Sequence, residues 1–573
     1  MRKSAMSAIA LLAVGSMALT GCGQKNQNNG EKGSSGGNDA KIALTDMNPK
    51  SRDELKDGGT LRFAISQLPS NWNLMSIDGN GVDNNTIGAF TLPGNWIYDE
   101  HAEYKPDPDY LESYDVKDAK DNNGKQVVTL HLNPKAKWNS GRTIDWSDYE
   151  ATWKAANGSN DAFKPATTDG WNQIESITKG DKDTDVVVTF KSSYPDWSAV
   201  LSGPLPKEGV ATPDAFNTGW TTFKPEWHSG PFTLDKVDTA QKTITLKRND
   251  KWWGDKAKLD TVVFRQLDDA TQTKAFANKE IDVVNTIITK DGYDTAKKRD
   301  DAAMRSAGSL QWRHFTFNSK AGALSDINVR QAINKGINRE SIARSDLAGL
   351  PVNPDDVMLG NHFFMPGQEG YENNVGDLKY DVEAAKKQLD EAGWKLADGD
   401  KVRKKDGKEL SINYARLTGV PTSENEGDRL QQDMANLGVK VNMVNTPPDS
   451  FSKTLTSHSF GVIAFTWQGT NYPLANVRQI YGAASEGSKQ PSQSNYSQLV
   501  DPELEKLIPQ IDTEMDAKKR IDLGNEADRI IWKNVQTLPL YQRVRFAAVP
   551  KNLANYGAAT FQSYRAQDIG FVK

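Results

Sequence analysis

The chain has 573 residues, of which 37% are hydrophobic, and it carries 70 Lys and Arg residues against 75 Asp and Glu residues. A chain of this length exceeds what one hydrophobic core supports, so we expect two or three domains. The net charge of −5 provides no basic face of the kind that general nucleic-acid binding needs, so we expect no nucleic-acid partner.

The first 22 residues have the pattern of an export signal. Arg2 and Lys3 precede an apolar run over residues 8–19, which is too short to span a bilayer as a helix of the mature protein. The run leads into the letters LTGC, in which Cys22 is the only cysteine of the chain. This pattern resembles a bacterial lipoprotein signal, which implies removal of residues 1–21 and a lipid anchor on the Cys22 thiol. The alternative is an ordinary secretory signal with an incidental cysteine.

The segment after the signal is polar. Residues 23–39 read GQKNQNNGEKGSSGGND and contain almost no apolar side chain. Such a composition predicts a flexible tether, which we expect to cover residues 22–57. The globular part is then expected to begin at residue 58.

Strand and helix patterns alternate after residue 58. Apolar and β-branched runs bounded by polar turns predict strands at residues 61–65, 127–132, 186–190, 243–247, 261–265, 281–284, 439–444 and 462–465. Capping residues predict helices that begin at Ser147, Asp269 and Asp381, and apolar anchors predict another helix over residues 517–532. Two of these strands flank the helix at Asp269, and this βαβ order favours a parallel sheet. The expected fold class is α/β or α+β, with several mixed sheets.

The sequence contains few signals of catalysis. It has no H-E-x-x-H helix and no P-loop, and its six histidines form no i, i+3 or i+4 pair. Its G-x-S-x-G match, residues 33–37, lies in the polar segment and not at a strand-to-helix elbow. A lipidated Cys22 leaves no thiol for disulfides, thiol catalysis or metal binding. We therefore expect no catalytic residue, no metal and no cofactor. Two distant carboxylates suffice for glycoside hydrolysis, so a surface lipoprotein hydrolase stays an alternative.

Several blocks recur in the order and spacing of a known family. They cover residues 104–114, 128–138, 141–149, 230–232, 246–253, 317–320, 327–333, 337–339, 388–394, 437–441 and 539–541. Together the blocks resemble family 5 of the bacterial extracellular solute-binding proteins, which are oligopeptide, dipeptide and nickel receptors of ABC importers. The resemblance runs from about residue 58 to residue 557. Most blocks of this kind preserve the scaffold rather than contact the ligand.

The resemblance implies a mixed α/β fold of the type II periplasmic-binding-protein kind, with a ligand cleft between two lobes. Lobe I is expected to contain residues 58–95, 223–312 and 545–573, and lobe II residues 313–544. An extra subdomain, residues 96–222, is inserted in lobe I. The chain then crosses between the lobes near Trp312 and near Arg545, so both places are hinge candidates.

The resemblance also points to a ligand-binding segment. In peptide-binding relatives an aspartate in a W-x-x-D-Y stretch holds the α-amino group of the ligand. The matching residues here are Trp467, Gln468, Gly469, Thr470, Asn471 and Tyr472. Trp467 and Tyr472 fit the pattern, but Thr470 or Asn471 stands where relatives carry the aspartate, so the segment has no negative charge. A tryptophan after a buried strand is equally typical of a core, and both interpretations of Trp467 stay open.

We therefore expect a receptor that captures an extracellular solute, in first place an oligopeptide, and delivers it to an ABC permease whose ATPase subunits hydrolyse ATP. The resemblance implies a monomer anchored by its lipid to the outer face of the cytoplasmic membrane, in a Gram-positive bacterium. An oligosaccharide receptor of the same family is the alternative among binding proteins, because the amine anchor is missing.

Overall fold

The structure is a computed structural model that describes residues 42–447 and 450–573. The predicted signal peptide and the lipidation site Cys22 lie outside the described residues. All described residues belong to one unit of the chain, residues 38–573.

The lobe I sheet has the strand order β2-β11-β10-β9. Its strands are β2 (Thr60–Ile65), β11 (Thr261–Gln266), β10 (Thr243–Arg248) and β9 (Phe232–Asp238). β11 pairs with β2 in parallel, and Val283 bridges to Phe63 in parallel on the other side of β2. The predicted βαβ unit therefore forms, with α6 (Asp269–Ala277) as its helix. The N-cap of α6 is Asp268 and not the predicted Asp269, and the strand predicted at 281–284 begins later, as β12 (Val284–Ile287).

The insertion sheet is antiparallel and has the order β5-β6-β8-β7. Its strands are β5 (Leu111–Lys117), β6 (Val127–Leu132), β8 (Asp185–Phe190) and β7 (Ile174–Lys179). Val128 and Leu130 on β6 and Val186 and Val188 on β8 are fully buried, which is the period-two alternation of a sheet with one covered face. Helix α2 (Trp146–Ala156) covers that sheet at β7.

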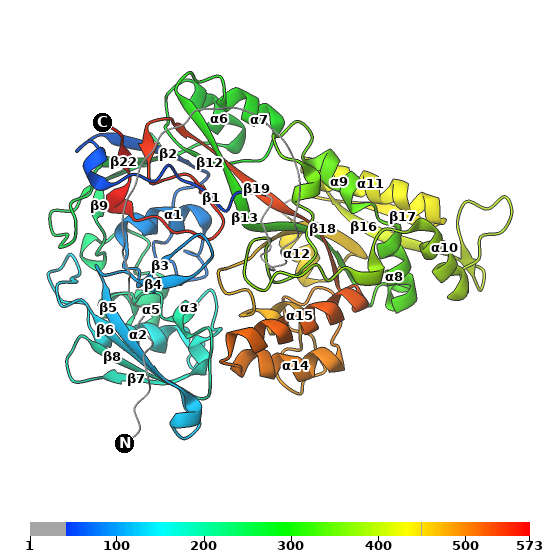
Figure 1. Cartoon of the computed structure of the whole chain (residues 1–573), viewed down its shortest axis with the longest axis horizontal. Coiled ribbons are helices and arrows are strands. Elements are labelled where there is room, and N and C mark those ends of the chain that lie inside the picture. The colour runs from blue at the N-terminus through cyan, green and yellow to red at the C-terminus, as the bar shows by residue number, and fades with distance from the viewer. Residues whose placement is uncertain (1–41, 448–449) are drawn as a thin grey trace, which may run out of the picture. The chain divides into compact units, whose positions relative to one another are not determined.

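The lobe II sheet has six strands in the order β12-β19-β13-β18-β16-β17. Its further strands are β19 (Thr537–Pro550), β13 (Ala302–Phe317), β18 (Val462–Gln468), β16 (Ser411–Leu417) and β17 (Lys440–Thr446). The long strands β13 and β19 run antiparallel side by side through the sheet (Figure 1). Their register shifts between Gly308 and Trp312, where the pairing with β19 is interrupted. The crossing predicted near Trp312 would fall at this interruption and stays a prediction.

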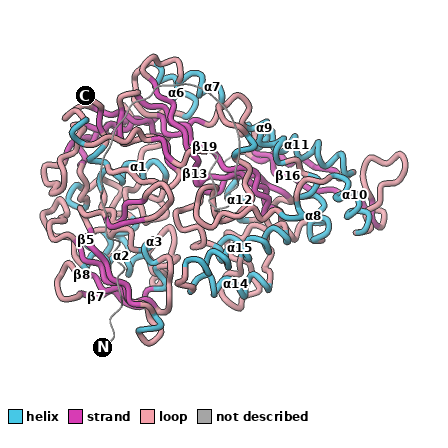
Figure 2. The backbone as a smooth tube through the Cα atoms, in the orientation of Figure 1, coloured by secondary structure: helices cyan, strands magenta, loops and turns pink. Residues whose placement is uncertain are grey.

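Helices pack around the lobe II sheet. They are α8 (Ile327–Gly336), α9 (Arg339–Asp346), α10 (Val382–Glu391), α11 (Pro421–Leu437), α14 (Pro502–Thr513) and α15 (Ala517–Asn534). Helices α14 and α15 lie side by side (Figure 2). α10 begins as predicted, because the Asp381 side chain accepts a hydrogen bond from the Ala384 amide at 2.9 Å.

The other elements are short. The helices are α1 (Val82–Thr91), α3 (Trp197–Val200), α4 (Lys207–Val210), α5 (Pro213–Asn217), α7 (Lys290–Ala296), α12 (Phe451–Thr456) and α13 (Val477–Tyr481). The strands are β1 (Thr45–Asp46), β3 (Trp96–Tyr98), β4 (Tyr104–Pro106), β14 (Lys404–Lys405), β15 (Lys408–Glu409), β20 (Leu553–Ala554), β21 (Ala558–Ala559) and β22 (Gly570–Phe571).

The prediction of a flexible tether up to residue 57 is wrong for its last part. β1 pairs with β21 near the C-terminus, and Leu55 is 1% exposed in contact with the end of the chain. The Arg52 guanidinium also forms an ion pair with Asp568. These partners lie about 500 residues away, so the polar composition of the segment gave no sign of them.

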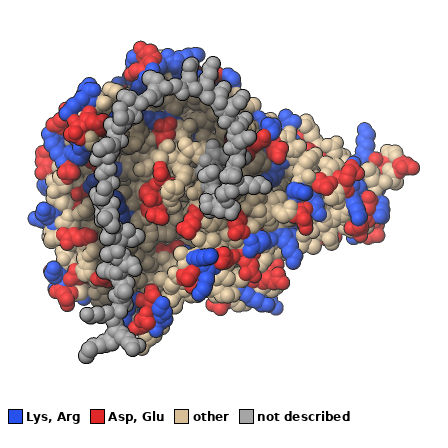
Figure 3. Space-filling view, in the orientation of Figure 1, with Lys and Arg blue, Asp and Glu red and all other residues tan. Residues whose placement is uncertain are grey.

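The hydrophobic cores also differ from the predicted boundaries. The core of the insertion extends only to Leu201, whereas residues 205–220 pack into the core of the lobe I sheet. Residues of α6, α7 and β12, which were assigned to lobe I, join the large core of the lobe II sheet instead. On the face shown in Figure 3, acidic and basic side chains are interspersed.

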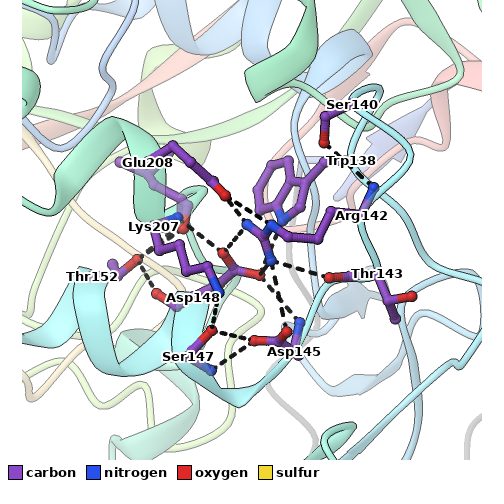
Figure 4. A network of polar contacts seen from close by, with 11 residues as sticks. Trp138, Ser140, Arg142, Thr143, Asp145, Ser147, Asp148, Thr152, Lys207 and Glu208 are labelled. Carbon is purple, nitrogen blue, oxygen red and sulfur yellow. Dashed lines mark hydrogen bonds and ion pairs between the residues drawn. The ribbon is translucent and has the colours of Figure 1, made fainter.

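The helix start predicted at Ser147 is the centre of a buried polar network (Figure 4). The N-cap is Asp145 rather than Ser147, and α2 begins at Trp146. The Asp148 carboxylate is fully buried and accepts hydrogen bonds from the indole of Trp138 at 3.0 Å and from Arg142 at 2.6 and 2.9 Å. It also accepts from the amides of Asp145 and Lys207. A carboxylate with this many donors is a structural anchor, so a role in the scaffold is enough to account for this block.

Candidate ligand-binding site

Strand β18 carries the predicted ligand segment to the end of the lobe II sheet. Its residues 462–465 are buried, whereas Thr466 and Trp467 are half-buried and Gln468 is exposed. Antiparallel pairing with β13 places Trp467 opposite Trp312. The chain then leaves the sheet at Gly469, whose amide donates to the carbonyl of Leu310 at 2.8 Å. The segment therefore begins beside the interruption of β13.

Trp467 lies in an aromatic stack. Its ring is nearly parallel to the rings of His314 and Tyr496, with 5.9 Å between ring centroids in each case. Burial and the nearby Arg313 charge hold the pKa of His314 well below its usual range, so the ring next to Trp467 is neutral. The indole nitrogen of Trp467 is buried and has no hydrogen-bond acceptor among the described residues. The three rings pack as aromatic side chains do in a hydrophobic core. The indole N–H of Trp467, by contrast, is a buried donor without an acceptor, which is unusual in a core.

The end of the segment touches parts of the chain that were assigned to lobe I and its insertion. The Tyr472 hydroxyl forms hydrogen bonds with the Tyr98 hydroxyl at 2.9 Å and with Ser198 Oγ at 3.0 Å. Asn471 Nδ2 donates to the carbonyl of Phe561 at 3.2 Å. Burial keeps the pKa of Tyr472 far above its ordinary value, so this hydroxyl is neutral. Residues 467–472 thus extend from the lobe II sheet to contacts with Tyr98, Ser198 and Phe561.

No carboxylate replaces the missing aspartate within this segment. Thr470 Oγ1 is occupied as the acceptor of the Tyr472 amide at 3.1 Å. Asp196 is close enough to Tyr472 to raise its pKa further, but Asp196 is buried and pairs with Arg520 at 2.8 Å. The negative charge nearest to Tyr472 is therefore already neutralised by an arginine.

Sequence reasoning missed the ion pairs around the segment. Arg313 and Glu426 are buried, and Arg313 Nε donates to the Glu426 carboxylate at 2.8 Å. Arg313 also donates to Thr466 Oγ1 at 3.1 Å, directly before Trp467. Partners separated by more than 100 residues leave no periodic signal in the sequence, so only the fold reveals them.

We expect the contact between Tyr472 and Tyr98 to be energetically coupled. Each single change to phenylalanine removes the same hydrogen bond, and a neutral hydrogen bond contributes about 1 kcal/mol. A double-mutant cycle of Tyr98→Phe and Tyr472→Phe, measured as the free energy of unfolding, will therefore give a coupling energy of about 0.5–1.5 kcal/mol. Additive effects of the two changes would contradict the contact.

No group of three or more His, Cys, Asp or Glu side chains among residues 42–447 and 450–573 is placed to hold a metal ion. Within the same residues, no helix is both long and apolar enough to cross a membrane.

Comparison with known proteins identifies the family. The model of "Bacterial extracellular solute-binding proteins, family 5 Middle" matches residues 105–489. The chain is 33% identical over 574 residues to the oligopeptide-binding protein OppA of Mycobacterium tuberculosis, a match that covers 99% of this chain and 94% of the relative.

Solved structures share the fold. The periplasmic EDTA-binding protein EppA superposes with a TM-score of 0.83 at 24% identity, covering 92% of this chain and 99% of its own. The oligopeptide-binding protein AppA of Bacillus subtilis, in complex with a nonapeptide, gives a TM-score of 0.71 at 20% identity, covering 91% of this chain and 100% of its own. The mixed α/β chain thus has the two-lobed fold of these binding proteins.

Members of this family are extracellular or periplasmic, and they work with an ABC permease and its ATPase subunits. The family match covers more than half of the chain, and the similarity to OppA extends over nearly all of it. This chain belongs to family 5 of the bacterial extracellular solute-binding proteins and is a solute-binding receptor of an ABC importer.

Proposed function

We propose that the protein captures oligopeptides in a cleft between its lobes and delivers them to the permease. The similarity to OppA of Mycobacterium over 99% of the chain carries this proposal. The segment 467–472 supports it, because these residues extend from the lobe II sheet to the contacts with Tyr98 and Phe561. A ligand between the lobes would lie beside this segment.

The backbone around the segment suits an extended peptide. β13 loses its pairing with β19 between Gly308 and Trp312, and β18 ends at Gln468 beside this interruption. Hydrogen bonds between the peptide backbone and such strand ends do not depend on the side chains of the peptide. They therefore provide affinity for many peptide sequences. Closure of the lobes around the peptide would then exclude water and form the surface that the permease recognises.

The amino end of the peptide is held without an aspartate in the segment. Asn471 Nδ2 is bound to Phe561, which leaves Asn471 Oδ1 as an acceptor for an ammonium group. A neutral acceptor of this kind contributes about 1 kcal/mol, so N-acetylation of a bound peptide should cost about that amount. Asn471→Asp should strengthen the binding of free-amine peptides. If both changes leave the affinity unaltered, this segment does not bind an amine, and the oligosaccharide alternative is favoured.

The protein is proposed to bind peptides without cleaving them. After incubation of the purified protein with a mixed peptide pool, a subset of peptides should be enriched on the protein and every peptide should remain intact by mass spectrometry. Hydrolysis that disappears when a single carboxylate is replaced would overturn this proposal in favour of a surface hydrolase.

Cys22 is proposed as the lipid anchor on the outer face of the cytoplasmic membrane. Cys22→Ala removes the only thiol of the chain. The variant is expected in the medium, or as uncleaved precursor, while the parent protein sediments with membranes. Fractionation followed by immunoblotting checks this. A processed variant that still sediments with membranes would show that another feature holds the protein there.

A further inference from the structure

A cavity in lobe II shares no lining residue with the segment 467–472. It has a volume of about 620 Å³ and is formed by the end of α8, the start of α9 and the chain between Met358 and Tyr380. A volume of this size is in the range of small-molecule sites in proteins.

One wall of the cavity contains the cation Arg339. Arg339 Nη1 donates to the carbonyls of Leu359 at 3.0 Å and Pro539 at 2.8 Å, and its guanidinium lies 5.4 Å from the Trp532 ring. Arg339 forms no ion pair among the described residues. Burial lowers the pKa of Arg339 to about 10, so the guanidinium stays charged at neutral pH. A half-buried cation without an ion-pair partner favours an anionic group beside it.

The start of α9 reinforces this preference. Asn338 is the N-cap of α9, and residues 338–340 line the cavity. The amides of Arg339 and Ser341 already donate to the carbonyl of Ile337 and to Asn338 Oδ1. The partial positive charge of a helix N-terminus nevertheless favours an anion. Glu340 and Lys379 also line the cavity, but both are exposed, so water screens their charges.

Another polar residue of the lining, Asn334, has an acceptor without a donor. Asn334 is 2% exposed, and its Nδ2 donates to the carbonyl of Leu378 at 2.8 Å. Its Oδ1 is buried and receives no hydrogen bond from any described residue. An unfilled buried acceptor is costly and is normally satisfied by a bound group. A ligand with a hydrogen-bond donor, such as an ammonium group, would satisfy Asn334 Oδ1.

The lining also contains apolar side chains. Ile337, Met358, Val375 and Leu378 contribute aliphatic surface, and Tyr380 at the rim is 47% exposed although its ring is large. Apolar side chains around a few placed polar groups are the usual composition of a small-molecule site.

We propose that this cavity binds a small zwitterion of the α-amino-acid type with an apolar side chain. Its carboxylate binds Arg339 and the N-terminus of α9, and its ammonium group donates to Asn334 Oδ1. Its side chain packs on Ile337, Met358 and Val375. The site is separate from the proposed peptide segment.

The test uses three probes and the purified full-length chain, with binding measured by titration calorimetry and saturation-transfer NMR. L-Leucine should bind once per chain. L-Leucinamide lacks the carboxylate and 4-methylpentanoate lacks the ammonium group, so each should bind about tenfold more weakly or worse, since each loses one charge-assisted hydrogen bond. Equal binding of all three probes would overturn the proposal.

Variants of the protein test whether L-leucine binds in this cavity. Val375→Trp fills the cavity and should abolish L-leucine binding, and Tyr380→Ala at the exposed rim should weaken it while the fold is kept. The matched control is Val444→Trp on β17, because Val444 is 43% exposed and does not line this cavity. Trp467→Ala should leave L-leucine binding unchanged. A cavity that holds only solvent would show no L-leucine binding at millimolar concentration, and loss of binding in Trp467→Ala would assign L-leucine to the peptide segment; either result overturns the proposal.

Discussion

Replacing Glu426 by leucine will lower the free energy of unfolding by about 3–5 kcal/mol. Glu426 is fully buried, and it is the partner of Arg313, which is 5% exposed. Removing one member of a buried ion pair leaves the other charge in a medium of low polarity. Arg543 lies close enough for its pKa to be lowered by burial and by the Arg313 charge, so the loss of Glu426 exposes both cations to mutual repulsion.

Chemical denaturation of three variants separates this effect from general damage. The double variant Arg313→Met/Glu426→Leu should recover most of the lost stability, because no uncompensated charge remains from the pair. Asp428→Asn is the matched control on α11, since Asp428 is 58% exposed and lies 3.6 Å from Arg416. It should change stability by less than about 0.5 kcal/mol. A Glu426→Leu protein as stable as the parent would show that the pair is not desolvated.

Trp467→Ala is expected to weaken peptide binding by about 2 kcal/mol, or roughly 30-fold in Kd. The ring is large, rigid and half-buried, and its stacking on His314 and Tyr496 holds it in place beside the end of β18. The same stack means that the variant also loses stability. Binding must therefore be measured by calorimetry at a temperature where the variant is fully folded.

Trp394→Ala is the control for that experiment. Trp394 is also half-buried and packs against the core of the lobe II sheet, but it lies outside the segment 467–472. It should lower the melting temperature without changing the peptide affinity. If Trp467→Ala behaves in the same way, Trp467 is a core residue and does not contact the ligand.

The elements that depend on local chemistry could be predicted from the sequence. α10 begins at the cap provided by Asp381 and is followed by Gly393 with a positive φ of 88°, because both residues act within one helical turn. β6 and β8 follow from apolar and β-branched runs bounded by polar turns. The end of the tether could not be predicted, because Thr45 pairs with Ala559 and no local pattern encodes a partner at that distance.

In the candidate site, too, some features could be predicted from the sequence and others depend on tertiary contacts. The resemblance located residues 467–472, and the missing aspartate was evident from Thr470 and Asn471. The stack around Trp467 and the ion pair between Asp196 and Arg520 depend on tertiary contacts, so they appear only in the folded chain. The buried acceptor of Asn334 has the same origin, since a sequence does not show which polar atoms remain unpaired.

Mass spectrometry of molecules that co-purify with the protein tests the central claim most directly. The Cys22→Ala chain, purified from the medium without denaturation and then unfolded, should release a set of short peptides, since a receptor that pairs with main chain retains many sequences. These peptides should be absent from the Trp467→Ala variant purified in parallel. Release of oligosaccharides or of a metal chelate in place of peptides would contradict the account.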